Sequence, residues 1–295
     1  MDFNKLFPDI RYEGETNLRK AQLVMLRMLK IVDFICDKYG LRYWLDGGTL
    51  LGAIRHKGFI PWDDDLDIAM PRDDYERFLS IASKELPEDL FIQTTNTDPA
   101  FDMFGKPPCK IRDEHSLIQE YHKKHASPHQ GIFLDIFPID RMHDTLPESK
   151  IDLRMKRYYW KLCILYNVPW VNSSNLKINL RNMAVLIRKV MGIDFWLQRY
   201  MKKARKRITQ NKQLKENYKL GFGFDVPWVR FFKPDDIFPL QRIPFEDAFF
   251  TAPFNYDSVL RQYYGDYRTL PPEAKRVNTH TSQIVIDSRV QSIQA

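Results

Sequence analysis

The sequence predicts an α/β protein of the α+β kind, with a mixed sheet core flanked by helices, a basic helical segment and an aromatic-rich C-terminal region. Three observations support this. Strand-like and helix-like apolar periodicities alternate along the first half of the chain. Lys and Arg concentrate in the middle, and aromatic residues concentrate near the end. We place the three regions at residues 1–147, 148–220 and 221–295.

Composition excludes several classes of protein. Hydrophobic residues make up 44% of the 295 residues and charged residues 28%, as in soluble globular proteins and unlike disordered chains. The longest uncharged stretch is about fifteen residues, short of the roughly 20 that span a bilayer. Three widely spaced cysteines, Cys36, Cys109 and Cys163, argue against a thiolate zinc site. Because the N-terminus lacks a secretory pattern, we expect a cytoplasmic location.

The first strong element is a helix over Asn17–Tyr39. Its apolar residues recur at steps of three and four, Thr16 can cap its N-terminus, and Gly40 can end it. A strand over Leu41–Leu45 follows, and then the turn Gly47-Gly48-Thr49.

The remaining elements of the first region alternate between helix and strand. Helices are expected over Leu50–His56 and Asp73–Leu86, and strands over Leu66–Met70, Leu90–Thr95, Cys109–Arg112 and Gly131–Phe137. After Pro138 we expect a helical and basic pattern up to about Lys219.

The basic segment has an uneven charge that suggests an anionic partner. Residues 150–219 contain 18 Lys and Arg and three acids, a net charge of +15 in a chain whose total is +7. Phe195–Ile208 reads as a basic amphipathic helix, which suits an anionic membrane surface or, equally, packing on the core. Without a recognised nucleic-acid motif, we do not expect a nucleic-acid partner.

An acidic run over Asp63–Asp67 is the densest candidate for chemistry. Four carboxylates in five residues repel one another unless a cation lies among them, and Asp65 and Asp67 share one face of a strand. A solvated loop is one interpretation. A calcium-binding EF-hand loop fails, because its sixth position is Ile68 and its twelfth is Asp74. A catalytic Mg²⁺ or Mn²⁺ site is favoured.

The glycine turn strengthens that interpretation. Gly47, Gly48 and Thr49 lie between a strand and a helix, where backbone N–H groups and a helix N-terminus can bind phosphate. A glycine turn followed by D-x-D predicts a phosphate-binding turn beside a metal site, as phosphoryl transfer from a nucleotide requires.

These motifs resemble the signature of the LicD family, in the nucleotidyltransferase-fold superfamily that includes the fukutin-related proteins. The segment GGTLLGAIRHKGFIPWDDDLDIAMPRDDYERF carries the resemblance, with support from CKIRD, GIFLDIFPID and PFNYDSVLRQYYGDYRTLPP. It extends from about Asn17 to His280 and implies a nucleotidyltransferase-like core. The basic segment matches no feature of the family.

The resemblance implies a phosphotransferase that moves a phospho-alcohol from a CDP-alcohol to a sugar hydroxyl. We expect phosphocholine from CDP-choline, transferred to teichoic acid, lipopolysaccharide or capsule, with a lipid-linked acceptor and peripheral attachment at the inner membrane face as further expectations. Asp65, Asp67 and Asp135 become the catalytic and metal-binding residues, and Asp135 is also a candidate base. The candidate donor-phosphate ligands are Gly47, Gly48, Thr49, Arg55, Lys110 and Arg112.

The aromatic-rich region offers a site for a choline head group. Residues 221–267 contain 14 aromatics, about twice the density of the whole chain, and aromatic faces attract quaternary ammonium groups. The candidates are Trp228, Phe231, Phe232, Tyr256, Tyr263 and Tyr264. The simpler alternative is that most of these residues build the core.

Other functions remain open at this point. A glycosyltransferase could use the D-x-D motif on a sugar nucleotide, and a nucleotidyltransferase could act on nucleic acid. A binding module without catalysis is disfavoured by the intact acidic run.

Overall fold

A computed structural model describes residues 3–102, 104–120, 127–167, 182–183, 186, 190, 192–278 and 281–286. The chain divides into two compact units. The first comprises residues 1–101, 109–137 and 235–295, and the second comprises residues 102–108 and 138–234. The predicted division of the chain into three regions at residues 147 and 220 stays a prediction. A compact unit is not necessarily a domain that folds independently.

The first unit is built on a sheet with the strand order β1-β2-β6-β4-β3. The strands are β1 (Trp44–Leu45), β2 (Asp67–Pro71), β3 (Leu90–Gln93), β4 (Cys109–Asp113) and β6 (Phe133–His143). β1 pairs antiparallel with β2, and β4 pairs antiparallel with β3 and β6. This order places β2, the D-x-D strand, directly beside the strand that carries Asp135. β2 begins at Asp67 and Asp65 lies just before it, so the predicted placement of both residues on one face of a strand is not found. The predicted class, a mixed sheet flanked by helices, is confirmed.

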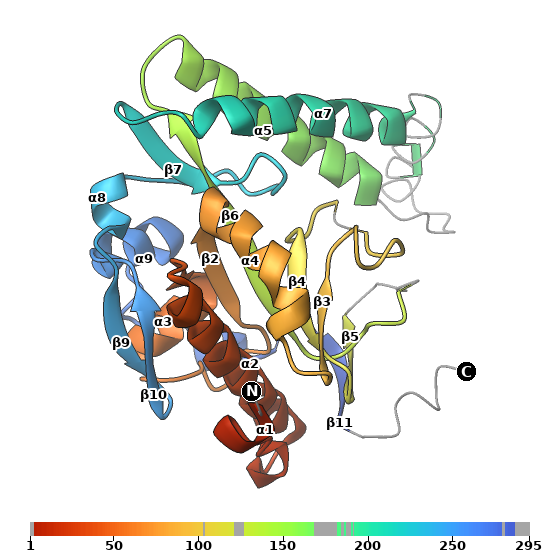
Figure 1. Ribbon diagram of the computed structural model, residues 1–295, viewed down its shortest axis with the longest axis vertical. Helices are drawn as coiled ribbons and strands as arrows, with labels where there is room; N and C mark the ends of the chain where they lie inside the picture. Colours follow the sequence, from red (N-terminus) through yellow and green to blue (C-terminus); the bar gives the residue numbers. More distant parts are fainter. Residues whose placement is uncertain are drawn as a thin grey trace. The chain divides into compact units, whose positions relative to one another are not determined.

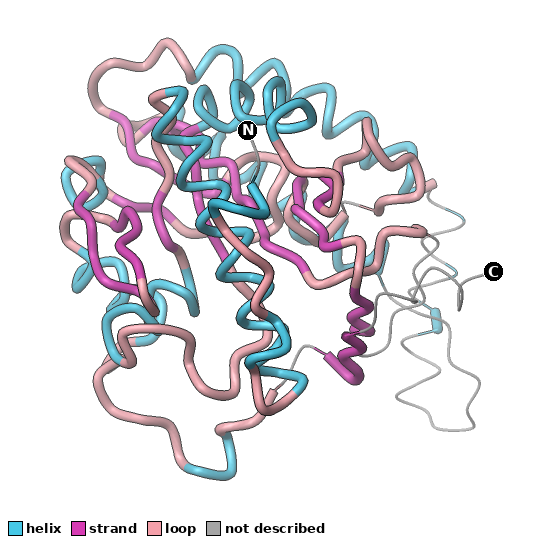
Figure 2. Tube along the Cα trace, turned by 60° about the horizontal axis from the view of Figure 1, so that its bottom comes forward, coloured by secondary structure: helices cyan, strands magenta, loops and turns pink. Residues whose placement is uncertain are grey.

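Helices α2 (Asn17–Tyr39), α3 (Gly47–Arg55) and α4 (Arg72–Glu85) pack around this sheet. α4 contacts α2, β2 and β3, whereas α3 contacts β2 (Figure 1). The predicted bounds of α2 are confirmed at both ends. The Thr16 side chain accepts a hydrogen bond from the N–H of Arg19, and Gly40 has a left-handed φ of 61°. Figure 2 shows α2 as a long helix.

The prediction of a helical pattern directly after Pro138 is wrong, because β6 continues to His143. Before Pro138 the strand pairs with β4, up to Ile136. From Ile139 it pairs with β7 (Tyr218–Phe222). Proline cannot donate a ladder hydrogen bond, and here it lies where the strand changes partners.

Smaller elements complete the first unit. They are α1 (Phe3–Leu6), a 3-10 turn (Arg11–Glu13), β5 (Ser116–Glu120), α8 (Pro234–Ile237), β9 (Gln241–Phe245), β10 (Ala248–Ala252), α9 (Tyr256–Tyr264), a second 3-10 turn (Glu273–Lys275) and β11 (Thr281–Ile286). β9 and β10 form an antiparallel hairpin, and β5 pairs with β11. α9 packs on α3, so part of the aromatic-rich region lies beside the glycine turn.

The second unit contains α5 (Glu148–Asn167), α7 (Ile193–Asn211), β7 and β8 (Phe231–Phe232). α5 and α7 pack together over a core that includes Tyr159, Tyr200 and Phe224. The fully buried Lys156 donates hydrogen bonds to the carbonyls of Gly223 and Val226. Within the described part of the chain, no helix combines the length and the apolar character needed to cross a bilayer.

Candidate active site

The glycine turn and the D-x-D strand form one hydrogen-bonded structure. α3 begins at Gly47 itself rather than at Leu50, and Gly47 has a left-handed φ of 52° that favours glycine. The N–H of Asp46 donates to the carbonyl of Asp67 at 3.1 Å. The N–H of Asp67 donates to Oγ1 of Thr49 at 2.8 Å. The start of the helix is thereby fixed against the start of β2.

The lack of side chains at the turn lets two carboxylates approach the helix. A Cβ at Gly47 would lie 3.1 Å from Oδ2 of Asp67, and a Cβ at Gly48 would lie 2.8 Å from Oδ2 of Asp63. Both carboxylates therefore lie against the N-terminal end of α3, where the helix dipole is positive. A larger side chain at either position would displace a carboxylate.

Five carboxylates share the region: Asp46, Asp63, Asp65, Asp67 and Asp135. Removal from water raises the pKa of Asp67, and the negative charges of the other four raise it further. Burial also raises the pKa of Asp135, although the charges of Lys110 and Arg112 oppose this. Acids that disfavour one another's ionisation form a site that gains from a bound cation.

The donor set fits a hard divalent cation such as Mg²⁺ or Mn²⁺, since all the ligands are carboxylate oxygens. The space left by Gly47 and Gly48 beside Asp67 and Asp63 fits the same interpretation. Among the described residues, however, no three acidic, His or Cys side chains already surround one cation position. Asp65, Asp67 and Asp135 as metal ligands therefore stay a prediction.

Lys110 forms an ion pair with one of these acids. It lies opposite Asp135 in the pairing of β4 with β6, and its Nζ contacts Oδ1 of Asp135 at 2.6 Å. Nζ also lies 3.5 Å from the ring centre of Phe133, and the Arg112 guanidinium lies 4.8 Å from the same ring centre. Both cations therefore approach the ring of Phe133, and a role in binding donor phosphate stays a prediction for each. Arg112 donates hydrogen bonds to the side-chain oxygen of Gln93 and to the carbonyl of Gly131, whereas Lys110 pairs with Asp135.

Arg55 lies at the C-terminal end of α3. Its guanidinium donates to the carbonyl of Tyr267 at 3.2 Å and to the ring of His56 at 3.0 Å. Burial lowers its pKa, while the charge of Asp63 raises it. The negative charge of Asp63 therefore acts on the guanidinium of Arg55. Contact between Arg55 and a donor phosphate stays a prediction.

Two tyrosines of α9 reach the acidic group. The hydroxyl of Tyr263 lies 2.8 Å and 3.0 Å from the two carboxylate oxygens of Asp46, to which it donates. Tyr264 stacks on Tyr263 with ring centres 5.6 Å apart. The pKa of Tyr264 is raised, first by removal of its hydroxyl from water and then by the charges of the aspartates, although 44% of the residue is exposed.

The other four candidate aromatics are one further residue of α9 and three residues of the second unit. Tyr256 begins α9, at the opposite end of that helix from Tyr263 and Tyr264. Trp228, Phe231 and Phe232 belong to the second unit. Trp228 and Phe232 both pack against Phe222 there. A role in choline binding stays a prediction for all four.

Asp46 was not assigned a role from the sequence, and Tyr263 was predicted only as a candidate choline-binding ring, not as a partner of Asp46. Asp46 is 2% exposed and directly precedes the helix, yet its side chain makes no capping hydrogen bond. An acid immediately before a glycine turn was the available signal. No sequence signal links Tyr263 to Asp46, because the pairing depends on the packing of α9 against α3.

Comparison with known proteins identifies the chain's relatives. Residues 40–180 match the family model described as LicD/FKTN/FKRP, nucleotidyltransferase domain. The chain is 31% identical over 273 residues to the lipopolysaccharide cholinephosphotransferase LicD of Haemophilus influenzae, an alignment that covers 91% of this chain and 98% of the relative.

Shorter similarities involve the mammalian ribitol 5-phosphate transferase FKRP. The mouse protein is 37% identical over 67 residues, which cover 23% of this chain and 14% of the relative. The human protein is 50% identical over 40 residues, which cover 14% and 8%. The match along nearly the whole Haemophilus protein, together with the glycine turn and D-x-D strand, shows that this chain is a transferase of the LicD family.

Proposed function

We propose that the protein transfers phosphocholine from CDP-choline to a sugar hydroxyl of a cell-surface glycan, such as teichoic acid, lipopolysaccharide or capsule. The observation that carries the proposal is a glycine-initiated helix whose N-terminus lies against Asp63 and Asp67. This is the place where a nucleotide's phosphates and a cation would meet. The relatives' names, a cholinephosphotransferase and a ribitol 5-phosphate transferase, support transfer of a phosphorylated alcohol.

The chain's own residues would bind the donor through its phosphates. The N–H groups of Gly47, Gly48 and Thr49 offer unpaired donors at the first turn of α3. Lys110, which contacts Asp135, adds a buried positive charge to the acidic group, and Arg55 and Arg112 are further candidate cations. These groups stabilise negative charge that accumulates on the phosphates during transfer.

Asp65 and Asp67, with Asp135 as third ligand, would hold Mg²⁺ or Mn²⁺. A bound ion of this kind neutralises donor phosphate oxygens and makes the phosphorus more electrophilic. The mutual repulsion of these acids, seen in the raised pKa of Asp67, favours its binding.

Asp135 is also proposed as the base. The sugar hydroxyl oxygen forms a bond to the phosphorus of the phosphocholine group, the bond from that phosphorus to the CMP oxygen breaks, and CMP leaves. The hydroxyl proton passes to Asp135. A carboxylate with a raised pKa suits this role, because it accepts a proton more readily near neutral pH.

Choline is favoured over an uncharged alcohol by the tyrosine pair. A trimethylammonium group donates no ordinary hydrogen bonds, so it is bound by aromatic faces and nearby negative charge. The stacked Tyr263 and Tyr264 provide aromatic surface beside the aspartates. We extend the proposal to a lipid-linked acceptor and to peripheral attachment at the cytoplasmic face of the membrane.

The test is phosphorus NMR of lipopolysaccharide and teichoic acid acceptors after incubation with the protein, Mg²⁺ and one of CDP-choline, CDP-ethanolamine or CDP-ribitol. We expect a new phosphodiester signal with CDP-choline, and none with Asp65→Asn. Asp144→Asn, an exposed acid in the second unit, serves as the matched control. Transfer only from CDP-ribitol would replace the choline assignment. Sugar transfer without a phosphodiester would identify a glycosyltransferase.

A further inference from the structure

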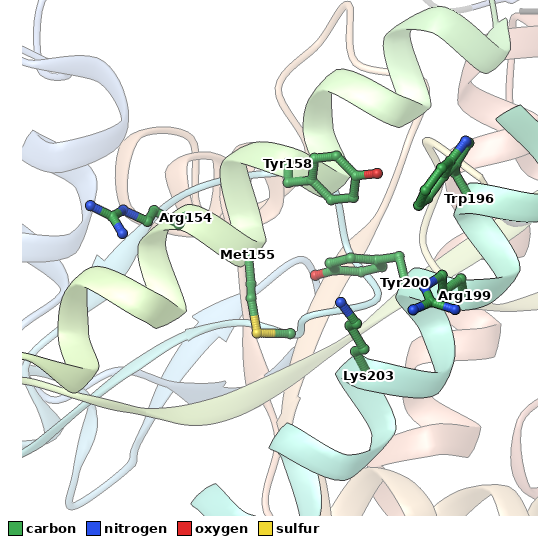
Figure 3. Close-up of a pocket in the computed structure, with 7 residues that line it drawn as sticks. All are labelled: Arg154, Met155, Tyr158, Trp196, Arg199, Tyr200 and Lys203. Carbon is green, nitrogen blue, oxygen red and sulfur yellow. The ribbon is translucent and has the colours of Figure 1, made fainter. Parts of the chain in front are cut away.

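The second unit contains a pocket of about 240 Å³ between α5 and α7 (Figure 3). Met155 and Tyr158 of α5 line it, together with Trp196 and Tyr200 of α7. All the residues that line it lie within this one unit. Nothing in the proposed transfer reaction uses this pocket.

Helical spacing explains how the pocket is built. On α7, Trp196, Tyr200 and Lys203 follow one another at steps of four and three, so they share one face of the helix. Tyr200 is the fixed part of the lining. It is 3% exposed, stacks on Tyr159 with ring centres 4.8 Å apart, and donates a hydrogen bond to the carbonyl of Phe224.

Three cations line the same pocket: Arg154, Arg199 and Lys203. Within the described part of the chain, none of the three forms an ion pair. Arg207, one turn beyond Lys203, differs because it pairs with Glu148 at 2.5 Å and with Asp152 at 2.6 Å. The charge of Arg207 is thus neutralised by two acids of α5, whereas three cations without an ion-pair partner among the described residues line the pocket.

Large apolar side chains are exposed around the pocket. Tyr158 is 44% exposed and Trp196 is 39% exposed, and the neighbouring Phe195 reaches 62%. Ordinarily such residues would be expected in a core or at a contact surface. Exposed aromatics beside Lys and Arg are typical of surfaces that bind at the boundary between lipid head groups and acyl chains.

From these observations we propose that the α5–α7 pocket binds the anionic head group of a membrane lipid, with Tyr158, Trp196 and Phe195 inserted at the head-group boundary. The three cations disfavour choline as the occupant, since their charges repel a quaternary ammonium group. They match a phosphate that carries a negative charge, and the apolar lining matches the attached glycerol and acyl groups. This inference stands independently of the proposed transfer reaction.

The experiment compares binding of the full chain to vesicles of phosphatidylcholine alone and of equal parts phosphatidylcholine and phosphatidylglycerol. One variant removes the pocket cations, Arg154→Ala/Arg199→Ala/Lys203→Ala. The matched control removes three exposed cations of α7 that do not line the pocket, Lys202→Ala/Arg205→Ala/Lys206→Ala. Both variants change the net charge equally, so diffuse electrostatic attraction would weaken both alike.

We expect the wild type to prefer the anionic vesicles. The pocket variant should lose about 100-fold in affinity, because each of three basic residues in contact with an anionic surface contributes about a fivefold factor. The control should lose about fivefold or less, because its cations do not line the pocket. Equal losses in the two variants, or no preference for anionic vesicles, would overturn the proposal. Circular dichroism checks folding, and the single pair Lys203→Glu and Lys202→Glu repeats the comparison with less risk to the fold.

Inorganic phosphate separates a lipid from a free anion. At matched ionic strength, replacing chloride with phosphate should leave vesicle binding unchanged, since the apolar lining requires the rest of the lipid. Displacement of the protein by phosphate would show a site for the free anion and would contradict the lipid assignment.

Discussion

The acidic site of the first unit and the α5–α7 pocket of the second concentrate charge of opposite sign by different means. The aspartates are crowded by a tight turn and two adjacent strands, Asp46 and Asp135 are buried, and removal from water raises the pKa of Asp67. The pocket cations lie on exposed helix faces, where each keeps its hydration. Buried carboxylates raise one another's pKa and require a partner, whereas exposed cations are screened and act on a surface at a distance. The comparison indicates that the acidic site suits catalysis and that the α5–α7 pocket suits attachment to an anionic surface.

The largest expected effect concerns the acidic site and tests its role in catalysis. Asp67→Asn should reduce transfer by about 1000-fold or more, since it removes a proposed metal ligand. Stability without divalent cation should not fall, because the substitution relieves repulsion among the aspartates. Product formation is measured together with the melting temperature. Full transfer activity of the variant, or an unchanged transfer rate of the wild type in EDTA, would contradict the assignment of Asp67 as a metal ligand.

A second substitution tests whether Lys110 balances the buried acids. Lys110→Met leaves the carboxylate of Asp135 without its 2.6 Å partner, and removing one member of a buried ion pair costs about 3 kcal/mol. Urea denaturation measures the loss. The exposed Lys202→Met is the control and should change the free energy of unfolding by less than about 0.5 kcal/mol. Similar values for the two variants would show that Asp135 does not depend on Lys110.

Salt should separate the two regions. Raising ionic strength from about 0.1 M to 1 M shortens the Debye length from about 10 Å to 3 Å. Binding to anionic vesicles should therefore fall by about tenfold or more, while transfer to a water-soluble acceptor changes by about twofold or less. Parallel losses in both assays would mean that the two functions share one surface.

The tyrosine pair tests the head group of the donor. Tyr264→Ala should weaken CDP-choline binding by about 2- to 30-fold, equivalent to about 0.5–2 kcal/mol for one cation–π contact. Its melting temperature should change little, because the ring is half exposed. Tyr256→Ala at the start of the same helix is the comparison. A variant with a lowered melting temperature but unchanged CDP-choline affinity would assign its ring to the core. The same two measurements apply to Trp228, Phe231 and Phe232.

The smallest expected effect is a change in pH dependence. The raised pKa of Asp67 means that the folded protein binds a proton more tightly than the unfolded chain does. Its contribution to stability is therefore greatest at low pH and is lost as pH rises from the ordinary carboxyl range through the raised value. The free energy of unfolding of Asp67→Asn should decline less steeply over that interval, measured without divalent cations. A steeper decline would contradict the sign of the shift.

The sequence predicted those parts of the fold whose determinants are local. α2 was placed at both ends, because Thr16 and Gly40 act on residues directly beside them. The turn and acidic run were found because they lie within one short segment. β6 beyond Pro138 was missed, since its second half depends on pairing with the distant β7. The bond from Tyr263 to Asp46 and the α5–α7 pocket were missed for the same reason, because each requires two helices or strands to meet.

The burial of Lys110 has a consequence for its reactivity as an amine. Acylating reagents attack the neutral, accessible form of lysine, and Lys110 is 3% exposed and bound as an ammonium to Asp135. It should therefore be modified far more slowly than the exposed lysines of α7. If a divalent ion draws Asp135 away, that protection weakens at one position in the chain. The acylation rate of Lys110, followed by mass spectrometry, thus becomes a built-in reporter of the state of the acidic site, independent of any donor or acceptor.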